Sequence, residues 1–72
     1  MNLTLEALLE YIHRFEIVDI RDQYGIEVND EAYGKCFEVF HTFEVKYKDL
    51  LKCPVNFIQT NAEGNIEIII NI

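Results

Sequence analysis

The chain has 72 residues, half of them hydrophobic, and its thirteen acidic and six basic side chains give a formal charge of -7. This length suits one domain, so we expect residues 1–72 to form a single small acidic domain, and the hydrophobic content argues against intrinsic disorder. The negative charge repels phosphate, which argues against direct binding of nucleic acid and favours a protein partner with a basic surface.

The first ten residues have neither the basic start nor the long apolar run of a secretory signal, and no segment is apolar over transmembrane length. We therefore predict a cytoplasmic protein without membrane contact. Cys36 and Cys53 are then expected to be reduced, because disulfides are rare in that compartment. No cofactor is expected, since the three glycines are isolated and form no phosphate-binding loop.

A first helix is predicted after Thr4, whose hydroxyl can cap it, because apolar residues recur at helical spacing as far as Phe15. Beyond Phe15 the apolar positions move to another side of the helical wheel, and one straight helix cannot bury both sets. Residues 15–24 therefore either form a second, shorter helix that stops at Gly25 or begin with a strand over residues 15–20. We favour two N-terminal helical segments.

The strongest local pattern is a stripe of apolar residues at helical spacing, which predicts a long amphipathic helix over residues 30–51. Asn29 or Asp30 can cap its start, lysines near its end suit the helix dipole, and Pro54 prevents its continuation. Gly34 falls in its first turns, where glycine weakens a helix. The stripe consists of Tyr33, Cys36, Phe37, Phe40, Phe43, Tyr47, Leu50 and Leu51.

Residues 55–72 are predicted to form an antiparallel β-hairpin around a four-residue turn that contains Gly64. We expect a register with Thr60 opposite Asn65, because it gathers the apolar residues on one face, which then packs on the long helix. The residues predicted for that face are Val55, Phe57, Ile66, Ile68 and Ile70.

The predicted register leaves Ile58 and Ile69 on the opposite, otherwise polar face of the hairpin. An isolated hairpin of this kind is only marginally stable. We therefore expect it to be covered, either by a third strand, for which residues 26–28 are the best candidate, or by a second subunit. The predicted fold class is α+β.

Residues 10–16 and 38–44 share the pattern Glu-x-x-His-x-x-Glu. Glu-x-x-His pairs project inward from two helices of di-iron and di-manganese carboxylate bundles. The helical wheels place the glutamates toward the polar side and the histidines at the stripe edge, so our first expectation is that no metal binds. The candidate ligands for the alternative are Glu10, His13, Glu38 and His41.

Glu16 and Glu44 fall within the apolar stripes, where a carboxylate is costly unless it is paired. Exposure at a helix edge is the simplest explanation, with Glu44 reaching Lys48 one turn later. The alternatives are that one carboxylate meets a cation of a partner or is kept protonated for acid–base work, and partner contact ranks above catalysis.

We expect a non-enzymatic protein-binding module, such as a small inhibitor, immunity protein, antitoxin or phage or plasmid accessory factor that acts on a basic protein surface. One alternative is a metal-binding dimer or metal-dependent enzyme that uses the Glu-x-x-His pairs. Another is a homodimeric structural subunit. The predicted partner contacts are Ile58, Ile69, Glu16 and Glu44.

Overall fold

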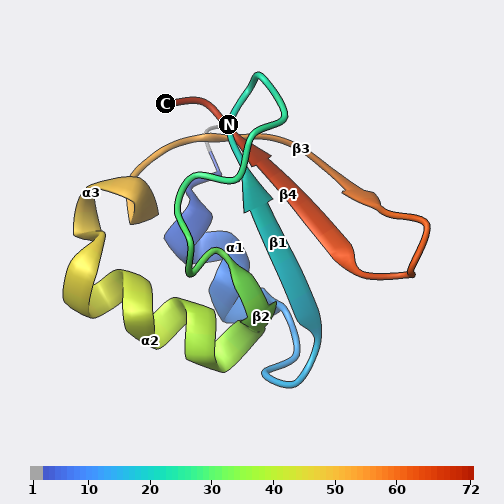
Figure 1. The fold of residues 1–72 in the computed structure, drawn as a ribbon. Coiled ribbons are helices and arrows are strands. Elements are labelled where there is room, and N and C mark those ends of the chain that lie inside the picture. The colour runs from blue at the N-terminus through green and yellow to red at the C-terminus, as the bar shows by residue number, and fades with distance from the viewer. Residues whose placement is uncertain (1–2) are drawn as a thin grey trace.

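The computed structural model describes residues 3–72 and contains three helices and four strands (Figure 1). The strands form one mixed sheet in the order β2-β1-β4-β3, in which β1 is parallel to β4 and the other neighbours are antiparallel. The α+β class is therefore confirmed. The elements are α1 (Leu5–Tyr11), β1 (Ile17–Arg21), β2 (Tyr33–Lys35), α2 (Cys36–Lys46), α3 (Lys48–Leu51), β3 (Val55–Thr60) and β4 (Ile66–Ile70).

The first helix begins where the sequence predicts it. The Thr4 hydroxyl accepts a hydrogen bond of 3.2 Å from the backbone N–H of Ala7 and so caps α1. The helix ends at Tyr11, however, and the favoured second helical segment is wrong, because residues 17–21 form β1. Val18 and Ile20 direct their side chains into the core, while Asp19 between them lies on the opposite face of the sheet, which is the period-two alternation of a strand.

The predicted long helix over residues 30–51 is wrong at its start and is interrupted near its end. Tyr33–Lys35 is β2, which pairs with β1, so α2 begins only at Cys36. At the other end Tyr47 leaves the helical conformation, with φ -133° and ψ 47°, and separates α2 from the short helix α3. Most of the apolar stripe is nevertheless used, because both helices direct it into one core, from which Tyr33 and Phe37 are excluded.

Gly34 has an unusual backbone conformation just before the chain changes from strand to helix. Its φ is +150°, a region that side-chain-bearing residues rarely adopt, and it pairs with Val18 in the sheet. A Cβ there would meet Cγ2 of Val39 at 3.6 Å, which is ordinary contact, so space is not the constraint.

We therefore expect Gly34→Ala to lower the free energy of unfolding by about 1–2 kcal/mol through backbone strain alone. Urea denaturation of the two proteins measures the difference. Ala62→Gly in the exposed hairpin turn is the control for a glycine–alanine exchange, and we expect it to change stability by less than about 0.5 kcal/mol. A Gly34→Ala protein as stable as the wild type would show that this backbone carries no strain.

The C-terminal hairpin is confirmed, although its register differs from the predicted one over most of its length. Val55 lies opposite Ile70 as expected, but a β-bulge at Asn56 shifts the remaining pairs by one residue, so that Thr60 faces Ile66. The turn accordingly has five residues instead of four, and Gly64 adopts a positive φ of 81° within it.

The bulge exchanges the faces of two apolar residues. Phe57 pairs with Ile69 and so lies on the face away from the helices, whereas Ile58 pairs with Ile68 on the helix side.

The third strand beside the hairpin is β1, and the predicted candidate 26–28 is wrong: Glu27 forms only an isolated bridge with Arg21.

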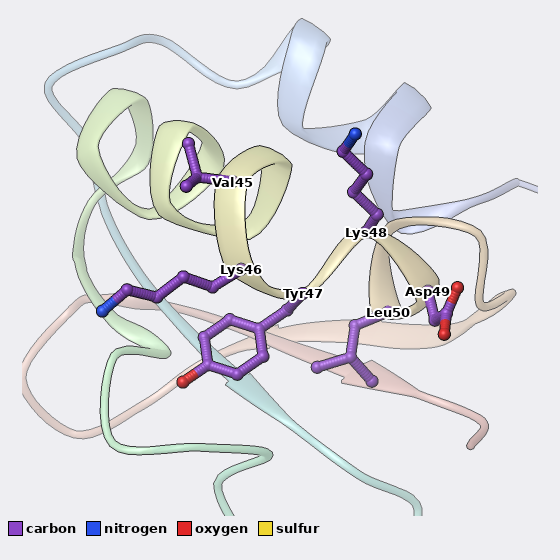
Figure 2. A pocket seen from close by; sticks show the side chains of 6 residues that line it. All are labelled: Val45, Lys46, Tyr47, Lys48, Asp49 and Leu50. Atoms are coloured by element: carbon purple, nitrogen blue, oxygen red, sulfur yellow. The ribbon is translucent and has the colours of Figure 1, made fainter.

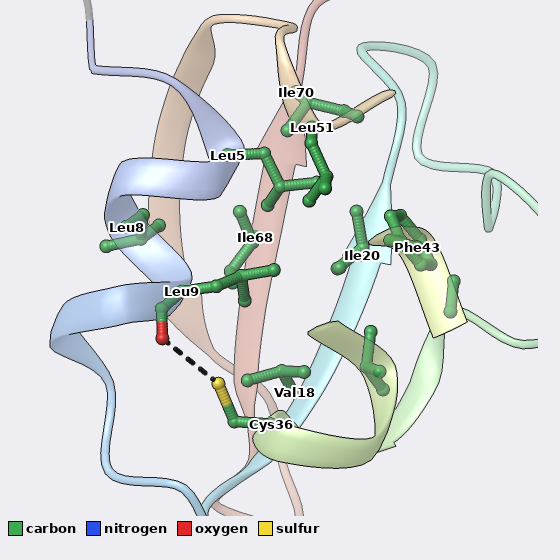
Figure 3. Packing of buried hydrophobic residues seen from close by; sticks show 12 residues of the cluster. Leu5, Leu8, Leu9, Val18, Ile20, Cys36, Phe43, Leu51, Ile68 and Ile70 are labelled. Carbon is green, nitrogen blue, oxygen red and sulfur yellow. Dashed lines mark hydrogen bonds between the residues drawn. The ribbon is translucent and has the colours of Figure 1, made fainter. Parts of the chain in front are cut away.

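The hydrophobic core lies between the helices and the two central strands, β1 and β4. Figure 3 shows the buried side chains of both strands directed toward α1 and α2. Cys36 belongs to this core, as predicted, and its Sγ lies 3.4 Å from the carbonyl oxygen of Leu9.

None of the helices within residues 3–72 has the length and apolar character that crossing a membrane requires.

Candidate functional site

The helices pack on one face of the sheet, and we call the other the helix-free face. Because partners in register lie on the same face, the pairing of the core residues Ile20 and Ile68 assigns every strand residue to one face or the other. The helix-free face consists of Ile17, Asp19 and Arg21 on β1, Tyr33 and Lys35 on β2, Phe57 and Gln59 on β3, and Glu67 and Ile69 on β4.

Three carboxylates surround one guanidinium near the middle of this face. Nη2 of Arg21 lies 3.1 Å from Oδ2 of Asp19 and 3.6 Å from Oε1 of Glu27. Glu67 is the register partner of Asp19 on β4, and its Oε1 accepts a hydrogen bond of 2.9 Å from Nε2 of Gln59. We call Asp19, Arg21, Glu27 and Glu67 the acidic cluster. Its three carboxylates and one guanidinium leave two uncompensated negative charges.

The charge of Arg21 is tied to this cluster. The hydrogen bond to Asp19 raises the pKa of Arg21, desolvation opposes that rise, and the charges of Asp19, Glu67 and Glu27 add to it. Nη1 also donates to the carbonyl oxygen of Gly25 at 2.8 Å, which holds the guanidinium in place. Arg21 therefore has little freedom to leave the cluster and neutralise other groups.

Asp19 is the buried member of the cluster, with only 3% of its surface exposed. Oδ2 accepts hydrogen bonds from Arg21, but the buried Oδ1 has no hydrogen-bond partner within residues 3–72. Tyr33 lies opposite Asp19 on β2, and its hydroxyl accepts a hydrogen bond of 3.0 Å from Nδ2 of Asn65, next to β4. The Tyr33 side chain thus crosses β1 and covers this part of the sheet. A buried carboxylate oxygen without a partner is costly and marks the cluster as the candidate site.

The chemistry open to such a cluster is the binding of a positively charged group. Within residues 3–72 no group of three or more histidine, cysteine, aspartate or glutamate side chains has the arrangement of a metal site. Guanidinium and ammonium groups bind carboxylates through one or two charge-assisted hydrogen bonds and need no such arrangement.

The candidate metal ligands from the sequence do not converge in the structure. Glu10 lies at the end of α1, and His13 lies beyond it, where Nδ1 accepts a hydrogen bond of 3.2 Å from the backbone of Phe15. The expected helical phase of that pair is therefore wrong. Glu38 and His41 do lie on α2, and all four side chains are exposed.

The two predicted apolar contact residues differ in accessibility. Ile69 lies on the helix-free face, as expected, but only 4% of its surface is exposed, so a partner cannot contact it without rearrangement. Ile58 is 46% exposed on the edge strand β3. Only Ile58 is therefore available for contact.

Glu16 and Glu44 are both exposed, which agrees with the simpler explanation for carboxylates at these positions. Glu16 precedes β1, and its carbonyl oxygen accepts a hydrogen bond of 2.8 Å from the N–H of Cys36. Glu44 lines a hollow between α1 and α3 together with Lys48, but the two form no ion pair within 4.0 Å. Neither carboxylate belongs to the acidic cluster.

A second hollow lies where α2 gives way to α3. Figure 2 shows that the residues around it follow one another in sequence, from Val45 to Leu50. Two of the polar groups there are paired with one carboxylate: Nζ of Lys46 lies 3.0 Å from Glu31, and the hydroxyl of Tyr47 lies 3.2 Å from it. The hollow is a consequence of the helix break.

The two thiols are unsuited to nucleophilic chemistry. Burial raises the pKa of Cys36, and burial together with the charge of Asp49 raises the pKa of Cys53. Both are free and protonated at neutral pH, whereas a catalytic cysteine needs a lowered pKa.

Two of the basic side chains are directed to aromatic rings. The guanidinium of Arg14 lies 5.0 Å from the ring centre of Phe15 and 5.5 Å from that of Phe37, and Nζ of Lys35 lies 5.7 Å from the Phe15 ring. These contacts join the start of β1 to the start of α2. They also leave the carboxylates of the chain with fewer cations to pair with.

No known protein family, curated protein or solved structure matches this chain. The functional argument therefore rests on the geometry of the chain itself.

Proposed function

We propose that the protein is a non-enzymatic binding module that docks a basic surface of another protein through its helix-free face. The observation that supports this most directly is the acidic cluster, where two negative charges remain uncompensated around the buried Asp19. A lysine or arginine of the partner would supply the missing charge, contacting the exposed Glu27 and the half-buried Glu67. The two free thiols suit a cytoplasmic location.

The remaining surface favours the same kind of partner. Within residues 3–72 only Asp19, Glu27 and Glu31 form ion pairs, so most of the thirteen acidic side chains are unpaired. Long-range attraction by such a surface speeds the association with a basic protein, and close contacts in the cluster then orient the partner. Masking a basic surface in this way is what a small inhibitor, immunity protein or antitoxin does.

Affinity capture with charge-reversed variants tests the proposal. The wild-type chain, fixed to a resin and exposed to extract of its own cells, is expected to retain a protein with a basic surface and to release it as the salt concentration rises. Glu27→Lys combined with Glu67→Lys is expected to abolish capture, because it reverses the charge of the cluster.

Glu10→Lys combined with Glu63→Lys is the matched control. It makes the same change in net charge at exposed positions on α1 and in the hairpin turn. This control is expected to retain most of the captured protein. Equal losses in both variants would mean that only net charge matters, and undiminished capture by the cluster variant would contradict the proposed site.

A further inference from the structure

The outer edge of β3 is a second candidate binding surface, because part of its main chain has no hydrogen-bond partner within residues 3–72. The start of this edge is covered: the N–H of Val55 donates to the carbonyl oxygen of Leu3 at 2.7 Å, and Leu5 donates to Cys53 at 3.0 Å. Beyond Val55, no main-chain hydrogen bond within residues 3–72 reaches β3 from its outer side. The open stretch runs over residues 56–60.

The backbone groups that this stretch offers follow from the hairpin ladder. The N–H of Asn61 donates inward to the carbonyl oxygen of Asn65 at 3.0 Å. Since alternate residues of an antiparallel strand direct their N–H and C=O groups to opposite sides, Thr60 and Ile58 direct theirs outward. An incoming strand would therefore find two donors and two acceptors.

The open stretch has few of the features that prevent an edge strand from pairing with a strand of another chain. It contains no charged residue and no proline, and its bulge lies at one end. Phe57 is 47% exposed on the helix-free face and Ile58 is 46% exposed on the helix side, so apolar surface flanks the edge above and below. The opposite edge of the sheet, β2, has three residues and leads directly into α2.

We propose that β3 pairs antiparallel with β3 of a second copy, which joins the two sheets edge to edge. A second copy suits this edge because residues 56–60 are uncharged, so self-pairing places no like charges opposite each other even though each chain carries a charge of -7. The second strand presents the same outward groups at Ile58 and Thr60, so the main-chain hydrogen bonds are formed reciprocally about a twofold axis. A charged peptide, by contrast, finds no complementary charge along this stretch.

The symmetry has a consequence for the helix-free face. Antiparallel pairing about a twofold axis perpendicular to the sheet keeps the helices of both copies on one side. The two acidic clusters then lie on one continuous face, which allows bivalent contact with a basic partner. The dimer does not depend on that partner, because the edge of β3 and the acidic cluster use different residues.

Sedimentation equilibrium of the full chain tests the dimer. From about 1 μM to about 1 mM the mass of the wild type is expected to rise toward twice the 8.5 kDa of one chain. Ile58→Lys is expected to keep it at the monomer mass over this range, since a lysine on the edge opposes pairing. Val45→Lys, at a 66% exposed position on α2, is the matched control and is expected to dimerise like the wild type.

Hydrogen exchange of the wild-type protein gives a test that needs no variant. The amide protons of Ile58 and Thr60 are expected to exchange more slowly as the concentration rises, while that of Gln59, which points inward, is expected to be unaffected. A monomeric wild type at every concentration, or exchange at Ile58 and Thr60 that is independent of concentration, would overturn the proposal. A dimer that persists in Ile58→Lys would place the contact elsewhere and overturn it as well.

Discussion

Phe43→Ala is expected to remove about 3–5 kcal/mol from the free energy of unfolding. Phe43 is fully buried beneath the sheet (Figure 3). Its ring meets that of Tyr47 edge-on with 5.4 Å between centres. A domain of 72 residues is typically stable by about 4–11 kcal/mol, so this one truncation removes a large share of the total. The loss combines the hydrophobic transfer of the ring with the cavity that remains.

Guanidinium denaturation followed by circular dichroism measures this loss. Phe15→Ala is the control, because that ring is about half exposed and its removal forfeits mainly contacts with Arg14, Lys35 and Phe37, worth about 1 kcal/mol. Similar losses from the two substitutions would show that the core does not depend on Phe43 as the structure indicates.

Local patterns predict those parts of the fold that local interactions determine. Thr4 caps α1 because its hydroxyl reaches the N–H of Ala7 three residues later. The hairpin depends on alternating apolar residues and on Gly64, which supplies the positive φ that its turn requires. Neighbouring residues are sufficient for these features, and the sequence predicts them correctly.

The missed strands depend on contacts between residues that are distant in sequence. Val18 pairs with Gly34 on one side and with Ile66 on the other. Neither pairing can be recognised from the spacing of apolar residues along the sequence. The apolar stripe includes Tyr33, whose spacing fits a helix although its backbone is in β2. Whether Tyr33 belongs to a helix or a strand is decided by its pairing with β1.

The candidate site was missed for the same reason. The alternation of Asp19 and Arg21 with Val18 and Ile20 is a signal for a strand with a polar face, and it favours the strand alternative for this segment. Glu67, however, joins Asp19 only because β1 and β4 are parallel neighbours, and the sequence does not reveal that order. Ile58 and Phe57 illustrate a further limit, since the bulge at Asn56 exchanged their faces along β3.

Three of the four members of the acidic cluster lie on the two central strands, and this position bears on the role of the cluster. Central strands are the most rigid part of a sheet, and a site built there keeps its geometry. The same position makes the charges expensive, because Asp19 is buried and one of its oxygens is unpaired. If the cluster serves binding at the expense of stability, some substitutions of its residues should raise the free energy of unfolding.

Arg21→Met tests how much of the sheet depends on the one cation in the cluster. The substitution keeps an unbranched apolar stem but removes every hydrogen bond that the guanidinium donates to Asp19, and it leaves three carboxylates facing one another. We expect the free energy of unfolding at neutral pH to fall by about 2–3 kcal/mol, which is less than for a fully buried pair because Arg21 is 30% exposed. Urea denaturation measures it.

Asp19→Asn separates charge from packing in the same experiment. In the wild-type background the substituted amide keeps an oxygen for Arg21 and gains an N–H that can donate to Glu67, so we expect stability to be unchanged or to rise by about 1 kcal/mol. In the Arg21→Met background the same change is expected to restore most of the loss, because the buried charge that lacked a partner is gone. A double variant no more stable than Arg21→Met alone would mean that the guanidinium contributes packing and not charge.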